Sequence, residues 1–131
     1  MKTLLMFKGP RLSVLEPAQK GVGLVTAKAS ALQKIDQKQV LALLDSVVKN
    51  GLPSNKERFR HLQKGIYELK TKRGIRIFCF VPEGRSGNVL VLTSLRRKPK
   101  PKVLKTEIER AKHWRDQYNM YAHRGNIHSI F

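Results

Sequence analysis

The spacing of hydrophobic residues predicts one strong helix near the middle of the chain. It begins near Asp36, where Gln39 three residues later resembles a capping box, and it ends before Gly51. A weaker helical pattern covers residues 25–35. The strong helix has one apolar face, formed by Val40, Leu41, Leu44, Val47 and Val48.

Residues 65–80 predict a β-hairpin whose register follows from its turn. A three-residue turn at 72–74, with Gly74 in the left-handed conformation, places Lys70 opposite Arg76. A two-residue turn would scatter the charges over both faces, so the three-residue turn is preferred. One face is then an apolar core face, made of Tyr67, Leu69, Ile75, Ile77 and Cys79. The other face collects Glu68, Lys70, Arg76, Phe78 and Phe80.

The remaining elements are a strand near the N-terminus, a strand before the last helix, and the last helix itself. Residues 89–95 form a nearly continuous apolar run, which is typical of a strand covered on both sides. A capping box at Thr106 and Glu109 predicts the start of the last helix. Near the N-terminus, residues 3–7 and 11–17 compete for one strand. We therefore expect an α+β fold: a strand and two helices, then a three-stranded antiparallel sheet and a C-terminal helix.

Composition adds a strong preference for a polyanionic partner. The 131 residues suit a single domain spanning 1–131, and the 40% hydrophobic content suits a folded core. Lys and Arg number 27 against 9 Asp and Glu, a net charge of +18, which points to nucleic acid or an acidic protein. The lone Cys79 lies in an apolar run and is interpreted as a core residue. The short apolar run at 3–7 predicts neither a signal peptide nor a membrane helix, so we expect a cytoplasmic protein.

Three basic segments could converge on one surface. They are residues 56–64, the hairpin face with Lys70 and Arg76, and residues 96–102. For residues 96–102 alone, a solvated charged face is an equally good explanation. Like charges that face each other across strands cost stability, however, so Lys70 and Arg76 indicate an anion held between them, and RNA phosphate is the obvious candidate. The residues expected to bind RNA are Arg58, Arg60, Lys72, Arg73, Arg96, Lys100 and Lys102.

The same surface offers the groups that RNA cleavage by the 2′-hydroxyl requires. Glu68 or Lys70 could accept the hydroxyl proton. Arg76 and Arg97 could hold the extra charge on phosphorus. Lys98 or His61 could donate a proton to the leaving oxygen, although His61 is more often expected to be a plain surface residue. No cofactor or metal is expected, because His113, His123 and His128 lack the clustered spacing of a zinc site.

Residues 59–118 contain, in this order, the segments "HLQKGIYELK", "RIFCF", "NVLVLTSL", "RRK" and "KTEIERAKHW". With these segments the chain resembles the HigB-like, phage-associated branch of the RelE/ParE toxin superfamily. Residues 1–55 resemble the family only in their predicted strand and two helices. The resemblance implies a RelE-like fold and a type II toxin–antitoxin toxin. Such a toxin cleaves mRNA on the translating ribosome without a metal and is inhibited by a helix-turn-helix, HigA-like antitoxin.

Position by position, the resemblance also implies site residues. Glu68 and Lys70 fall where the second strand of the family presents its site, and Arg76 falls at the arginine of the third strand. Arg96, Arg97 and Lys98 fall at the cation cluster after the fourth strand. The best-known ribonucleases of the superfamily carry a lysine where Glu68 stands, and a related branch poisons DNA gyrase. The alternative is therefore a non-enzymatic nucleic-acid-binding or gyrase-poisoning protein of the same fold.

Overall fold

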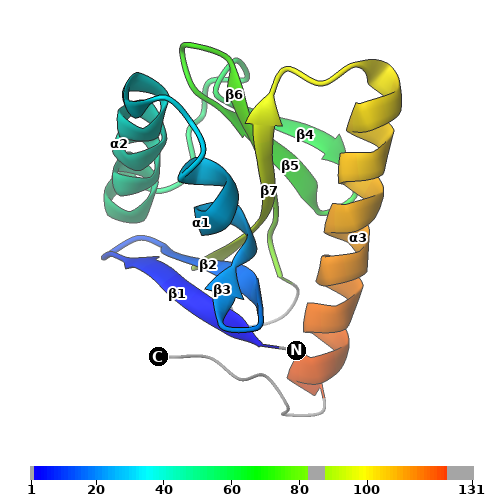
Figure 1. Cartoon of the computed structure of the whole chain (residues 1–131). Coiled ribbons are helices and arrows are strands. Elements are labelled where there is room, and N and C mark those ends of the chain that lie inside the picture. Colours follow the sequence, from blue (N-terminus) through cyan, green and yellow to red (C-terminus); the bar gives the residue numbers. More distant parts are fainter. Residues whose placement is uncertain (1, 83–87, 124–131) are drawn as a thin grey trace.

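A computed structural model of the chain describes residues 2–82 and 88–123, with side chains as far as Tyr121. Seven strands and three helices occur in these ranges (Figure 1). In chain order they are β1 (Thr3–Lys8), β2 (Ser13–Gln19), β3 (Val22–Gly23), α1 (Leu24–Ala29), α2 (Lys34–Asn50), β4 (Phe59–Gln63), β5 (Ile66–Lys70), β6 (Ile75–Phe80), β7 (Val89–Arg97) and α3 (Pro101–His123).

The strands form one mixed sheet in the order β1-β2-β7-β6-β5-β4, and β3 pairs with β2 beside this path. Strands β2 and β7 are parallel, with Ser13 opposite Val89 and Leu15 opposite Val91. All other pairs are antiparallel. Figure 1 shows α1 and α2 on one side of the sheet and α3 on the other.

The predicted fold class is wrong, because the sheet has seven strands and a strand-rich N-terminus instead of one strand and two helices before a three-stranded sheet. The segments 3–7 and 11–17 do not compete, since both form strands and pair with each other. Their place in the sheet depends on the parallel pairing of β2 with β7, which no local pattern reveals. The edge strand β4 was missed because most of its residues are exposed, so it carries no apolar alternation.

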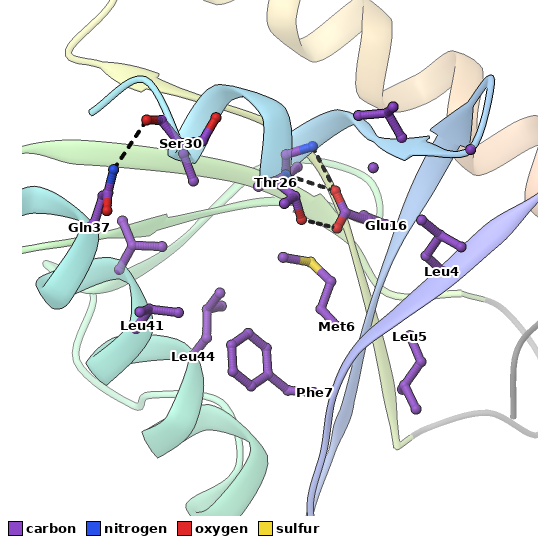
Figure 2. A pocket seen from close by; sticks show the side chains of 16 residues that line it. Leu4, Leu5, Met6, Phe7, Glu16, Thr26, Ser30, Gln37, Leu41 and Leu44 are labelled. Carbon is purple, nitrogen blue, oxygen red and sulfur yellow. Dashed lines mark hydrogen bonds between the residues drawn. The ribbon is translucent and has the colours of Figure 1, made fainter. Parts of the chain in front are cut away.

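The short helix α1 is held by a buried carboxylate from β2. Glu16 accepts hydrogen bonds from the backbone N–H groups of Val25 (2.8 Å) and Thr26 (2.9 Å), and from the Thr26 hydroxyl (Figure 2). An acidic group at a helix N-terminus satisfies free N–H donors there. Gly23 leaves space for this carboxylate, because a Cβ at that position would collide with it. The helix therefore depends on a residue eight positions upstream.

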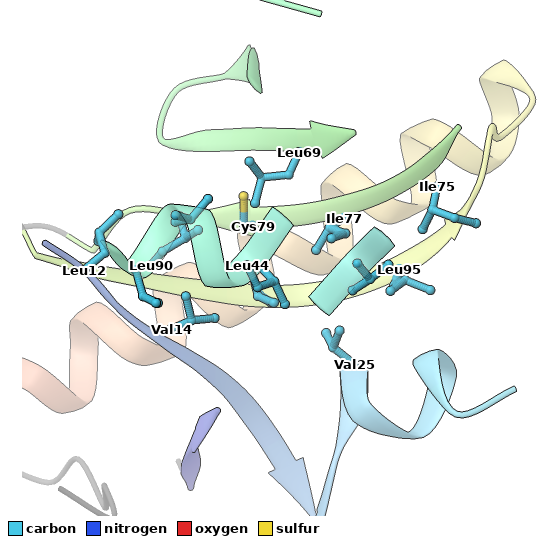
Figure 3. Packing of buried hydrophobic residues seen from close by; sticks show 14 residues of the cluster. Leu12, Val14, Val25, Leu44, Leu69, Ile75, Ile77, Cys79, Leu90 and Leu95 are labelled. Carbon is cyan, nitrogen blue, oxygen red and sulfur yellow. The ribbon is translucent and has the colours of Figure 1, made fainter. Parts of the chain in front are cut away.

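Two apolar cores fill the spaces on either side of the sheet. The first lies under α1 and α2, where Val25 and Leu44 pack on strand residues that include Leu69, Ile77 and Leu90 (Figure 3). The second lies under α3 and is formed by Leu15, Ile66, Phe80, Val89, Val91, Ala111 and Tyr118. Strand β7 contributes to both cores, as expected for a strand that is covered on both sides.

The predicted hairpin register is confirmed. Lys70 is opposite Arg76 and Leu69 is opposite Ile77, and the N–H of Gly74 bonds to the carbonyl of Thr71 (3.0 Å). Gly74 has φ +94°, a left-handed conformation that a residue with a Cβ rarely adopts. The hairpin turn is therefore the one that the hydrophobic pattern requires.

Both long helices begin earlier than the sequence predicts. Helix α2 starts at Lys34, and its N-cap Gln33 makes no side-chain hydrogen bond, so the capping box at Asp36 is wrong. Helix α3 starts at Pro101 instead of Thr106. Proline suits the first helical turn, because a backbone N–H there would have no acceptor within the helix. Leu41 does not join the core, since 53% of it is exposed. Across the part of the chain that the structure describes, no helix combines the length and apolar character needed to span a bilayer.

Candidate functional site

Three basic residues lie side by side across β5, β6 and β7. Lys70 is opposite Arg76, and Arg76 is opposite Arg96, so their side chains project from the same face of the sheet. We call Lys70, Arg76 and Arg96 the cation row. Arg58 precedes β4 at the end of this row, and its carbonyl accepts the N–H of Lys70 (2.8 Å). The convergence of Lys70, Arg76 and Arg96 therefore follows from strand register.

A buried carboxylate lies beside the cation row. Glu68 is only 3% exposed, and its Oε1 is 2.9 Å from Arg76 Nη1 and 3.5 Å from Arg60 Nη2. Within residues 2–82 and 88–121, the buried atoms Glu68 Oε2 and Arg76 Nε have no hydrogen-bond partner. Unpaired buried polar atoms are costly, so the fold carries an energetic penalty at this pair of side chains. Lys70 is half-buried and forms no ion pair with any residue described.

Helix α3 contacts the cation row through a second buried carboxylate, Glu107. It accepts hydrogen bonds from the Ser94 hydroxyl of β7 and from Arg110 (2.8 Å). Arg96 Nε lies 4.0 Å from the same carboxylate. Glu107 thus fixes the helix against the strand that carries the last member of the cation row.

Arg97 lies away from the cation row, on the opposite face of the sheet. Successive residues of β7 alternate in direction, and Arg97 reaches Asp36 of α2 (Nη2 to Oδ2, 2.5 Å). Arg73 of the hairpin turn binds the same carboxylate (Nε to Oδ1, 2.9 Å). Burial alone would raise the pKa of Asp36, but the hydrogen bonds from Arg73 and Arg97 outweigh it and hold this pKa below its ordinary value. The catalytic role of Arg97 stays a prediction, and the ion pair gives it a structural role.

The other residues expected to bind RNA or donate a proton are spread around the row. His61 is opposite Tyr67 and contacts its ring edge (centroids 5.1 Å apart), so it lies on the face away from Glu68. Lys98 and Lys100 are exposed in the link between β7 and α3, and Lys102 is exposed in the first turn of α3. Lys72 is exposed in the hairpin turn. The structure thus brings together Glu68, Lys70, Arg76 and Arg96, with Arg60 beside Glu68, but not His61, Arg73 or Arg97.

Neither a metal nor a reactive thiol is indicated near this surface. The described ranges contain no group of three or more His, Cys, Asp or Glu residues arranged to hold a metal ion. The side chains of His123 and His128 lie outside those ranges. Cys79 is fully buried, and burial, with a smaller contribution from Glu68, raises the pKa of its thiol. Its interpretation as a core residue is confirmed.

Sequence reasoning missed three functional or structural carboxylates, Glu16, Asp36 and Glu107, all of which are buried. Asp36 was noticed only as a helix cap. One signal could have found Asp36 and Glu107, because acids are rare in this chain and cations are abundant enough to pair with a buried acid. Glu16 instead accepts the N–H groups at the start of α1. The sequence could not show which cation pairs with which acid.

An apolar groove opens on the face opposite the cation row, between β1, α1 and α2 (Figure 2). Its volume is about 630 Å³. The walls are mainly aliphatic and include Leu4, Met6, Phe7, Val22, Leu41 and Leu44. Val22 and Leu41 are about half exposed, at 54% and 53%. Such a surface is typical of a protein interface.

Comparison with known proteins identifies the family. No curated protein matches the chain. The family model described as phage derived protein Gp49-like (DUF891) matches residues 28–116. This family belongs to the RelE/HigB-like group of toxin–antitoxin toxins, which are generally endoribonucleases and are each paired with an antitoxin. Because the match spans well over half of the 131 residues, the chain belongs to the Gp49-like family of toxins.

Proposed function

We propose that this chain is the HigB-like toxin of a type II toxin–antitoxin system and that it cleaves mRNA on the translating ribosome. The observation that carries the proposal is the cation row beside the buried carboxylate of Glu68. A row of cations on one sheet face suits the regularly spaced phosphates of a single strand. The family match supports the toxin role.

Cleavage would use the 2′-hydroxyl of the RNA as its nucleophile. Glu68 or Lys70 accepts the hydroxyl proton, and the 2′-oxygen forms a bond to phosphorus. Arg76 and Arg96 hold the extra negative charge that develops on the phosphate oxygens. Lys98 donates a proton as the bond to the 5′-oxygen breaks. The products are a 2′,3′-cyclic phosphate and a free 5′-hydroxyl, and no metal takes part.

Inducible expression in a bacterium, with mapping of mRNA 5′ ends, tests this proposal. The wild-type chain should arrest growth and create new 5′ ends inside translated regions. Lys70→Ala should prevent both, since Lys70 is free of ion pairs with the described residues and its loss removes charge only. Lys49→Ala is the matched control, because Lys49 is an exposed lysine of α2 whose ion-pair partner among the described residues is Asp45. Growth arrest with DNA breaks and no new 5′ ends would instead favour the gyrase-poisoning alternative.

The antitoxin would be a helix-turn-helix, HigA-like protein, and we propose that one of its amphipathic helices occupies the apolar groove. An apolar groove suits the apolar face of a helix. Exposed lysines lie along its borders: Lys34 and Lys38 next to Leu41 on α2, and Lys20 next to the Gly21-Val22 turn. Both acids of α2 are already paired, Asp36 with Arg73 and Arg97, and Asp45 with Lys49. The docked helix should therefore carry acidic residues beside its apolar face.

Co-expression with the adjacent reading frame tests this docking site. Leu41→Glu places a charge in the groove and should prevent rescue of growth, while the variant remains toxic on its own. Ile35→Glu is the matched control, since Ile35 is an exposed residue (49%) of the same helix that does not line the groove. Equal rescue of both variants would place the antitoxin elsewhere, for example over the cation row.

A further inference from the structure

A second, polar pocket lies between α1 and α3, and the proposed reaction does not use it. The pairing of β2 with β7 extends only to Leu15 and Val91, so the later half of β7 is flanked by α1 and α3 instead. The pocket there has a volume of about 310 Å³. It is lined by Gln19, Leu24, Lys28, Thr93, Arg110 and Trp114. This volume is at the small end of the range of ligand sites.

The pocket borders a charge cluster with more cations than acids: Lys28 and Arg110 line the pocket, and Glu107 and Arg96 lie beside it. Lys28 Nζ lies 3.0 Å from the hydroxyl of Ser94, which in turn donates to Glu107. Arg110 and Arg96 share the same Glu107 carboxylate. Three cations thus surround one buried acid, which leaves an excess of about two positive charges. An anion in the pocket would balance them.

The direction of the Lys28 pKa shift agrees with this excess of positive charge. Burial lowers the pKa of Lys28, Glu107 opposes the shift, and the positive charges of Arg110 and Arg96 add to it. An ammonium group has three N–H donors, and within the described ranges Lys28 uses one of them, toward Ser94. Donors therefore remain for the oxygens of a phosphate.

Trp114 supplies an aromatic wall to the same pocket. The rings of Trp114 and His113 meet in an edge-to-face arrangement, with centroids 5.3 Å apart. Aromatic side chains beside cations are the usual means of holding a nucleobase and its phosphate. Neither an inorganic ion nor an apolar ligand would use both features.

We propose that this pocket binds one nucleotide, with its phosphate on Lys28 and Arg110 and its base stacked on Trp114. The inference rests on the proposed function in one respect, namely that the nucleotide belongs to the bound RNA. Arg96 connects the two sites, because it is a member of the cation row and also lies beside Glu107. A strand held on the cation row would thus extend into the pocket.

The single tryptophan of the chain gives a direct test. Titration of the full-length protein with AMP should quench Trp114 fluorescence to saturation, and inorganic phosphate should compete. Lys28→Gln and Arg110→Gln should each raise the Kd about tenfold or more, the expected effect of losing one charge-assisted hydrogen bond. Lys49→Gln should leave the Kd unchanged. Circular dichroism of each variant confirms that it is folded, and Arg110→Gln serves if Lys28→Gln does not fold.

Three results would overturn the proposal: no saturable quenching at millimolar AMP, adenosine binding as tightly as AMP, or an unchanged Kd in both folded variants. The titration requires no cleavage, so it is independent of the proposed function. Saturable AMP binding without new mRNA 5′ ends in cells would remove the nuclease assignment and keep the pocket. New 5′ ends without AMP binding would remove the pocket alone.

Discussion

Replacing Arg76 with alanine should destabilise the fold, because it leaves the carboxylate of Glu68 buried without its closest partner. The side chains of Glu68 and Arg76 are 3% and 12% exposed, so solvent can replace little of the lost interaction. Removing one partner of a buried ion pair costs about 3–5 kcal/mol. Arg60 remains 3.5 Å from Glu68 and retains part of the interaction, so we expect a loss of about 3 kcal/mol, near the low end of that range.

Urea unfolding, followed by far-ultraviolet circular dichroism, measures this loss at a constant m-value. The double variant Glu68→Gln/Arg76→Met removes both charges, and its free energy of unfolding should lie within about 1 kcal/mol of wild type. A loss below about 0.5 kcal/mol in Arg76→Ala would refute the reasoning, since it would mean that Glu68 is not held as a buried ion. If the loss is as large as expected, reduced toxicity of Arg76→Ala alone cannot be assigned to chemistry.

Three further outcomes are expected. Asp36→Asn should lower the free energy of unfolding at neutral pH. The pKa of Asp36 is lowered in the folded protein, so its stabilising contribution is complete above the ordinary pKa of 3.8 and disappears as the pH falls through the folded-state pKa. The urea midpoints of the variant and the wild type should therefore converge in acid. Cys79 should resist an aromatic disulfide reagent in the native protein and react once urea unfolds it, and fast native labelling would contradict its burial. The logarithm of the affinity for single-stranded RNA should fall with log salt by about 0.7 per phosphate bound, and an affinity indifferent to salt between roughly 50 and 200 mM would exclude the cation row as the RNA contact.

The sequence determined the hairpin and its charged face. Only a three-residue turn at 72–74 keeps Leu69 and Ile77 on one side, and the opposition of Lys70 and Arg76 follows from that register. It also determined the end of α2 at Gly51 and the burial of β7 on both faces, because these depend on local periodicity. Three residues of the candidate site, Glu68, Lys70 and Arg76, were therefore readable from residues 65–80 alone.

The tertiary structure decided the rest. The N-terminal strands take their place through the pairing of residues 13–15 with 89–91, which lie too far apart in sequence for any local pattern to relate them. Asp36 and Arg97 are 61 residues apart in sequence and Lys28 and Ser94 are 66 apart, so neither the position of Arg97 nor the second pocket could be derived beforehand. Local spacing fixes which residues share a strand face. The partner of a buried charge depends on which distant segments the whole sheet brings within a few ångströms, and only the folded chain contains that information.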